Sequence, residues 1–327
     1  MSEVPTLIEF CGVYLGQATH FDEIRTESLA EHFRQYFHLG PFPALDDLVA
    51  LCKRLGIELA QLPQIPGAPE GLNIWLKGRA PVVHIRSGLS TRRTETTICH
   101  ELREIIENAF TRVNHSYTGI LTNNNELMNP KSDRFAGCLL MQAEATRKRL
   151  QELGYDYAAF ASETRRSLAS VLLRAQQLYL AGQPGPAPIA GVWLFEAPWS
   201  AVESGCVSAP DIKLAHQVHL SGFSMQKTGR HFASRLAWTV FPKARATVVS
   251  VPITRLALDF GCPVTTVVRG FDLFGEHDFL VAAEPFFVKN MPWRVLLTGI
   301  QAANAKLVAP WLARLGATIV DDTFQVL

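Results

Sequence analysis

The sequence predicts an α+β protein built from three parts. Apolar residues recur at helical spacing in several segments of residues 20–182, whereas the chain beyond residue 189 consists mostly of β-branched and aromatic runs separated by turn residues. Between them, the stretch GQPGPAPI (182–189) has the proline and glycine content of a linker. We therefore expect a mixed α+β N-terminal domain at 1–142, a small helical module at 143–183 and a C-terminal α+β domain at 184–327.

Helices and a short hairpin account for the N-terminal part. Helical spacing predicts a helix within 20–39 and a second at 45–55, each followed by a glycine that ends it. A short strand is expected at 57–63, and a hairpin at 71–87 turns near Lys77-Gly78-Arg79. A helix follows over 96–110, and another begins near Ser132 or Asp133.

The part beyond the linker is expected to be rich in strands. Five β-branched or aromatic runs predict them, at 189–197, 246–256, 263–275, 278–288 and 293–301, and one helix is expected at 306–316. His216 and His219 form an H-x-x-H pair, and His231 follows, but no third ligand lies at typical metal-site spacing. Five of the six tryptophans lie in this part, where they fit either a ligand pocket or a β-rich core.

Bulk composition narrows the classes of partner. The formal net charge is +1, so the chain has no overall attraction to nucleic acid or to anionic membranes. No apolar run reaches the roughly 18 residues that span a bilayer, and the N-terminus lacks a signal-peptide pattern. Six scattered cysteines without a C-x-x-C pair predict reduced thiols and a cytoplasmic protein.

The segment TTICHELREIIENAF (96–110) contains most of a metallopeptidase motif. In His-Glu-x-x-His, two histidines one turn apart bind one zinc ion, and the glutamate takes a proton from metal-bound water. His100 and Glu101 keep the first ligand and the general base, whereas Glu104 replaces the second histidine. Carboxylates also bind zinc. The alternative is an ordinary amphipathic helix whose charged residues are solvated, with Cys99 among its core residues.

The surrounding motifs resemble the ImmA/IrrE family of bacterial metallo-endopeptidases over about residues 20–180. The order is D-L-x-x-L-C-x-x-L-G-I-E-L, a hairpin with Ile74-Trp75, T-E-T-T-I-C-H-E, and D-R-F-A-G-C-L-L-M. The resemblance implies a zincin-like peptidase domain, a helix-turn-helix-like module and a GAF-like sensor domain. It also implies a stress-response regulator whose partner is a transcriptional repressor.

Carrying the family's zinc site over to this chain leaves it incomplete. The family's third ligand is the glutamate four positions before the phenylalanine of E-A-N-x-F-A, and here that position is Lys131, because the phenylalanine is Phe135. A protonated lysine cannot bind a cation. Two of the three implied ligands are thus replaced, by Glu104 and Lys131, and these two residues carry opposite charges. We therefore expect a Glu104–Lys131 ion pair where the family has zinc.

Other side chains near the motif could supply the ligands of an active metal site. Glu107 lies on the same helix face as His100, while His115 and Glu126 fall in the following loop. The helical module also carries a set of basic residues, Arg147, Lys148, Arg149, Arg165, Arg166 and Arg174, which fit either direct DNA binding or a solvated face balanced by nearby acids.

Two functions follow from the resemblance. In the first, a degenerate site has no zinc, and the chain binds a helix-turn-helix repressor or another protein. In the second, the chain is an active zinc endopeptidase with a His-Glu-x-x-Glu site at His100, Glu101 and Glu104.

Overall fold

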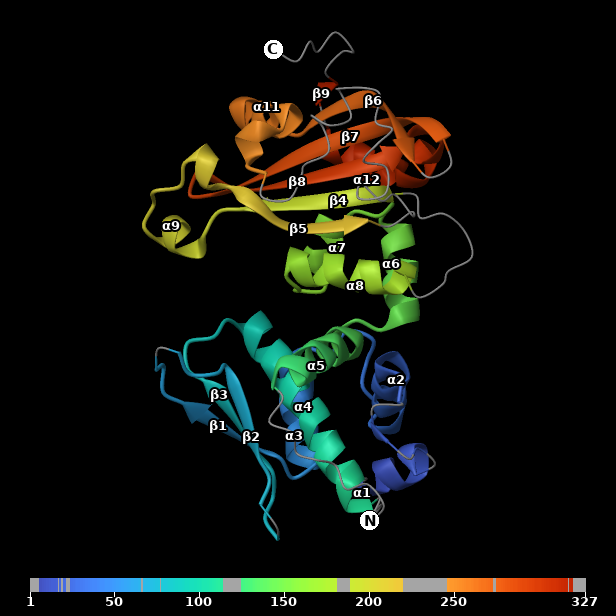
Figure 1. The fold of residues 1–327 in the computed structure, drawn as a ribbon, viewed down its shortest axis with the longest axis vertical. Helices are drawn as coiled ribbons and strands as arrows, with labels where there is room; N and C mark the ends of the chain where they lie inside the picture. The colour runs from blue at the N-terminus through green and yellow to red at the C-terminus, as the bar shows by residue number, and fades with distance from the viewer. Residues whose placement is uncertain are drawn as a thin grey trace. The chain divides into compact units, whose positions relative to one another are not determined.

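The computed structural model of the protein describes residues 6–113, 125–180, 189–219 and 246–319, apart from positions 17, 19, 22, 23, 66, 77, 273, 274 and 317. The chain forms two compact units, Met1–Thr146 and Arg147–Leu327 (Figure 1). The predicted linker falls almost wholly outside the described residues, and the three-part division stays a prediction. None of the described helices is long and apolar enough to cross a membrane.

Unit 1 combines helices with one small sheet, as the sequence predicts. Its elements are α1 (Leu7–Phe10), a π-helical turn (Cys11–Leu15), α2 (Thr26–Tyr36), α3 (Leu45–Arg54), β1 (Glu58–Leu62), β2 (Gly71–Ile74), β3 (Val82–Arg86), α4 (Thr91–Val113) and α5 (Asn125–Leu140). The helix α6 (Ala143–Glu152) contains the boundary between the units.

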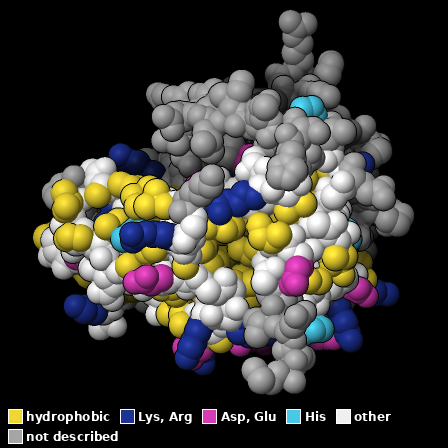
Figure 2. Space-filling model, turned by 90° about the horizontal axis from the view of Figure 1, so that it is seen from below, with side chains coloured by type: hydrophobic (Ala, Val, Ile, Leu, Met, Phe, Trp, Pro, Cys, Tyr) yellow, Lys and Arg dark blue, Asp and Glu magenta, His cyan; other side chains and the backbone are white. Residues whose placement is uncertain are grey.

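The sheet of unit 1 has the order β1-β3-β2, with β1 parallel and β2 antiparallel to β3. Strand alternation divides its side chains between two faces. Val83 is fully buried in the core, and Gly71 and Asn73 lie on that same face, toward α4. Leu72 and Ile74 lie on the opposite face and are exposed. Figure 2 shows apolar side chains gathered over this sheet.

The helix α4 runs through the core of unit 1. Its apolar stripe is buried, as predicted: Ile98, Cys99, Leu102, Ile105, Ile106, Ala109 and Phe110 are fully covered. Beside it lies α5, which buries Phe135, Ala136 and Leu139. The buried guanidinium of Arg34 on α2 donates to the carbonyls of Cys138 and Leu139, at 2.7 Å each, and so caps the C-terminal end of α5. These contacts join α5 to α2.

Unit 2 places helices on a six-stranded sheet. Its elements are α7 (Tyr157–Glu163), α8 (Leu168–Leu180), β4 (Ile189–Glu196), α9 (Trp199–Glu203), β5 (Lys213–His219), α11 (Pro252–Phe260), β6 (Val264–Asp272), β7 (Gly275–Val288), β8 (Met291–Gln301), α12 (Ala309–Leu315) and β9 (Thr318–Ile319), with 3₁₀ turns at Ala209–Asp211, Val248–Ser250 and Ala302–Val308. The strand order is β5-β4-β8-β7-β6-β9, antiparallel except for the β6–β9 pair.

One predicted strand of unit 2 is wrong. Residues 246–256 form a 3₁₀ turn and the start of α11. Pro252 lies in the first turn of α11, where its missing N–H costs nothing, and Gly261 ends the helix in the left-handed conformation. The hydroxyl of Thr254 donates to the carbonyls of Val248 and Val251. These local signals outweigh the β-branched composition.

A charged cluster in unit 2 joins its helices to the sheet. Arg314 on α12 pairs with Asp156, whose side chain also caps the N-terminus of α7, and with Glu284 on β7. Asp156 and Glu284 are both buried. We call Asp156, Glu284 and Arg314 the Arg314 cluster. It shows that the helical segment after residue 156 is packed onto the C-terminal sheet.

Candidate functional site

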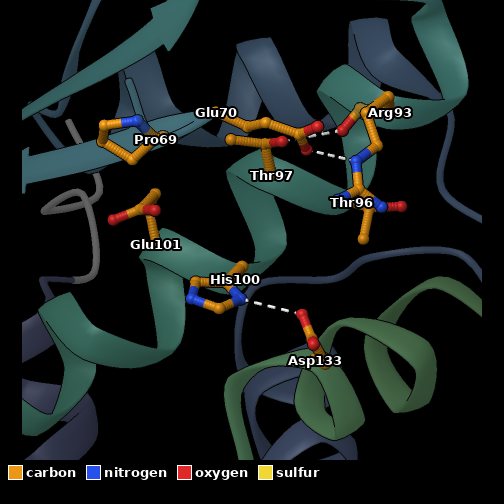
Figure 3. Close-up of a pocket in the computed structure, with 9 residues that line it drawn as sticks. Pro69, Glu70, Arg93, Thr96, Thr97, His100, Glu101 and Asp133 are labelled. Atoms are coloured by element: carbon orange, nitrogen blue, oxygen red, sulfur yellow. Dashed lines mark hydrogen bonds and ion pairs between the residues drawn. The ribbon is translucent and has the colours of Figure 1, made fainter. Parts of the chain in front are cut away.

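The helix α4, the strand β2 and the helix α5 bring five polar residues together. His100, Glu101 and Glu104 come from α4, Asn73 comes from β2, and Asp133 comes from α5. We call these residues the His100 cluster. Three of them, His100, Glu101 and Asp133, line a pocket of about 280 Å³. Figure 3 shows His100 pointing toward Asp133 in this pocket, with Glu101 on the side nearer Pro69.

His100 bridges two carboxylates. Its Nδ1 lies 3.0 Å from Asp133 Oδ1, and its Nε2 lies 3.4 Å from Glu104 Oε1. Burial alone lowers the pKa of His100, but the contacts with Asp133 and Glu104 and the charge of Glu101 outweigh it and raise the pKa to about 9. His100 therefore carries a positive charge at neutral pH in this arrangement.

Asn73 bridges the carboxylates of Glu101 and Glu104. Its Nδ2 donates to Glu101 Oε2 at 2.7 Å and to Glu104 Oε2 at 2.6 Å. Burial raises the pKa of Glu101 despite the bond from Asn73. Burial also acts on Glu104, but the bonds from His100 and Asn73 outweigh it and lower the pKa of Glu104. One amide group thus ties together the two carboxylates that the motif supplies.

The predicted Glu104–Lys131 ion pair is wrong. In the part of the chain that the structure describes, Glu104 bonds to His100 and Asn73, and Lys131 is not among its partners. Lys131 and Asp133 are two residues apart on α5, which corresponds to a rotation of about 200° around the helix axis. With Phe135 buried in the core, it is Asp133 that comes to His100. The residue opposite the motif is therefore an acid, not a base.

The alternative ligands do not assemble within the described residues. Glu107 pairs with Arg103 at 3.1 Å rather than with the His100 cluster. His115 lies outside the described residues, and the side chain of Glu126 is not described. The idea that the charged residues of α4 are simply solvated is also wrong, since Glu101 and Arg103 are almost completely buried.

The donor set fits a three-ligand zinc site poorly. His100 Nε2 and Glu104 Oε1 face one another, but Asp133 meets the opposite ring nitrogen, so it cannot share an ion with them. Asn73 presents an N–H donor, not a lone pair, between Glu101 and Glu104. Among the described residues, no three His, Cys, Asp or Glu side chains converge to hold a metal ion.

The basic residues predicted for DNA binding do not form one exposed group. Within the helical segment, Arg166 and Arg174 are buried, and Arg149 is paired with Glu152 and Glu163. These residues do not add to a basic face. His216 lies half-buried on β5, while the side chain of His219 and all of His231 lie outside what the structure describes.

Sequence reasoning missed Asn73 and Asp133 as partners of the motif. The sequence places Asn73 in the predicted hairpin, but its contact with α4 depends on how β2 packs against that helix. The signal for Asp133 was its place two residues before Phe135, on a helix whose buried positions were already predicted.

Comparison with known proteins identifies the class of domain. Residues 52–176 match the sequence model of the IrrE N-terminal-like domain, a peptidase family. The chain therefore carries an IrrE N-terminal-like domain, and the resemblance predicted from its motifs is confirmed. No curated protein matches the sequence.

Solved structures add a similarity in fold. A Mycobacterium tuberculosis transcriptional regulator has a TM-score of 0.54 with this chain at 12% identity, covering 96% of this chain and 88% of the other. An RNA-binding Light-Oxygen-Voltage receptor has a TM-score of only 0.20 at 14% identity, covering 53% of this chain and 65% of the other, and carries no argument. The GAF-like nature of the C-terminal domain stays a prediction.

Proposed function

We propose that this chain is a cytoplasmic stress-response regulator on the ImmA/IrrE plan, whose peptidase site has become a structural hydrogen-bond network. It acts by binding a helix-turn-helix repressor or another protein, and its C-terminal domain senses a signal. A solved protein of similar fold is a transcriptional regulator, which supports a role in transcription.

The amide of Asn73 is the observation that carries this proposal. A metallopeptidase glutamate must accept a proton from metal-bound water. Here the Glu101 carboxylate accepts a bond from Asn73, which holds Glu104 as well. His100, the first ligand of the motif, is enclosed by Glu104 and Asp133. The groups that would bind metal and move protons instead satisfy one another.

The second candidate is an active zinc endopeptidase acting through His100, Glu101 and Glu104. One distance favours it: His100 Nε2 and Glu104 Oε1 are 3.4 Å apart, a separation open to two ligands bound at about 2.0–2.2 Å to one tetrahedral ion. It also requires a third ligand, which the described residues do not supply.

A cleavage assay separates the two candidates. The full chain is incubated with candidate helix-turn-helix repressors, with and without one equivalent of zinc, beside the Glu101→Gln and Glu107→Gln variants. We expect binding without cleavage by all three proteins. Zinc-dependent cleavage by the wild type and by Glu107→Gln, but not by Glu101→Gln, would establish the peptidase instead.

A further inference from the structure

The outer face of the small sheet in unit 1 carries a row of exposed aliphatic side chains. Burial alternates along residues 71–76, so Leu72, Ile74 and Leu76 lie on one side of the chain, opposite the face that packs on α4. They are 44%, 41% and 58% exposed. Figure 1 shows α3 and α4 together on the opposite, covered side of this sheet. We call Leu72, Ile74 and Leu76 the outer row.

The outer row borders further apolar surface. Val82 and His84 on β3 pair with two of its residues, and Ala60 lies beyond His84 on β1. All three neighbours are half-buried. The carboxylate on this face at the level of Val82 belongs to Glu58, two strands away from β2. Single exposed apolar residues are ordinary, whereas a contiguous group of them is typical of an interaction surface.

Two arginines lie at the Leu76 end of the outer row. The ring N–H of Trp75, the residue directly before Leu76, donates to the Arg79 carbonyl at 3.0 Å, and the Arg112 guanidinium stacks over the same ring at 3.9 Å. Both arginines are exposed. Among the described residues, no carboxylate lies within ion-pair distance of either one. This end of the row therefore offers positive charge to an acidic partner.

The charges at the other end of the row are satisfied within the chain. Glu70, two residues before Leu72, pairs with Arg86 at 3.1 Å and with Arg93. A second copy of the chain is thus a poor match, because a two-fold contact would bring the exposed arginines against each other or against the paired Glu70. An anionic lipid surface is a poor match as well, since carboxylates lie beside the same apolar face.

The spacing of the outer row matches the apolar stripe of an α-helix. Alternate residues of an extended chain lie about 6.7 Å apart, and residues four apart on a helix rise by about 6.0 Å. Apolar side chains at positions i, i+4 and i+8 of an amphipathic helix would therefore meet the three members of the row in turn. Acidic residues are favoured in the first turn of a helix, where they would oppose Arg79 and Arg112.

We propose that the outer row binds an amphipathic helix of the partner protein, with the acidic first turn of that helix at Arg79 and Arg112. Side chains make this contact across the face of the sheet, on the opposite side from the His100 cluster. The inference rests on the proposed function and deepens it, because a helix-turn-helix repressor supplies helices of this kind. It assigns partner recognition to a surface that contains no residue of the metal motif.

Binding of a synthetic helix to the full chain tests the proposal. The probe is a fluorescent peptide of about 15 residues, with leucines at i, i+4 and i+8 and glutamates in its first turn. In a second peptide, lysines replace these glutamates. Fluorescence anisotropy should show that the wild type binds the acidic peptide about 10-fold more tightly than the lysine peptide.

Two serine variants test whether the peptide lies on the outer row. Ile74→Ser should weaken binding of the acidic peptide about 10-fold, because it removes apolar surface from the middle of the row. The matched control is Val49→Ser on α3, which changes an equally exposed aliphatic residue outside the row and should leave the affinity unchanged. Failure of the wild type to bind the acidic peptide, or equal binding by Ile74→Ser, would overturn the proposal.

Arg79→Glu tests the charge at the end of the row. It should reverse the preference, so that the lysine peptide binds more tightly; an unchanged preference in the folded variant would overturn the proposal. So would dimer formation, or binding to phosphatidylglycerol vesicles, that is present in the wild type and lost in Ile74→Ser, because the row would then bind a second copy or lipid. Zinc-dependent cleavage of a repressor, by contrast, would overturn the proposed function without altering the peptide affinities.

Discussion

Each unit of this protein places one cation between two carboxylates, but the two clusters differ in their cation and in the burial of their carboxylates. In unit 1, His100 lies between Asp133 and Glu104 at the edge of a pocket. In unit 2, Arg314 joins Asp156 and Glu284. A guanidinium stays protonated at any physiological pH, whereas an imidazole changes its charge with its surroundings. The ion pairs of the Arg314 cluster therefore keep their cation at any physiological pH, whereas the His100 cluster can lose its cation when His100 is deprotonated.

Breaking the ion pairs of the Arg314 cluster should have the largest effect on stability. Arg314→Met keeps most of the side-chain volume but leaves two buried carboxylates without their cation. We expect a loss of about 3 kcal/mol in the free energy of unfolding of unit 2, at the low end for a broken buried pair, because the Arg314 side chain is 45% exposed. Urea denaturation followed by tryptophan fluorescence measures it, since five of the six tryptophans lie in unit 2.

The matched control for this prediction is Arg255→Met, which breaks an exposed ion pair with Asp259 on α11. We expect it to cost less than about 1 kcal/mol. Equal effects of the two substitutions would show that burial of Asp156 and Glu284 does not matter.

A change of pH should separate the two clusters next. The pKa of His100 rises from 6.5 to about 9 on folding, so the folded state binds the proton more tightly. Its stabilisation is then complete below pH 6.5 and is lost as the pH rises to 9, by up to about 3 kcal/mol. Calorimetry at pH 6.5 and pH 9 should show that unit 1 loses the stabilisation that protonated His100 provides. His100→Gln should abolish it, and a pH effect that persists in that variant would refute the assignment.

A pair of aspartate substitutions should give the smallest effect. Asp133 is 67% exposed, whereas Asp156 is almost completely buried. Asp133→Asn should cost less than about 1 kcal/mol, and Asp156→Asn about 2 kcal/mol. Both replacements preserve shape, so the difference in unfolding free energy isolates the effect of burial on each ion pair. Equal costs would remove the distinction between the two clusters.

Periodicity alone located most elements of unit 1. The buried stripe of α4, from Ile98 to Phe110, follows helical spacing, and the hairpin that became β2 and β3 followed alternation and a turn. In unit 2 the prediction of a strand at 246–256 is wrong, because a helix begins within this β-branched segment at Pro252. Composition is a weak guide where proline and a left-handed glycine set both ends of an element.

The candidate site was only half predictable for a geometric reason. His100, Glu101 and Glu104 lie on one helix, so their spacing fixed their relation. Asp133 and Asn73 come from other elements, and an offset of two residues on α5 was enough to choose Lys131 instead of Asp133. The Arg314 cluster joins residues 158 positions apart in the sequence, so no local sequence pattern could predict it.

The metal content of the purified full chain, measured by elemental analysis without added zinc, tests the central claim most directly. If the His100 cluster has replaced the metal by hydrogen bonds, the protein contains far less than one zinc per chain, and added zinc does not raise its melting temperature. One zinc per chain, retained through dialysis and lost in His100→Gln, would contradict the account.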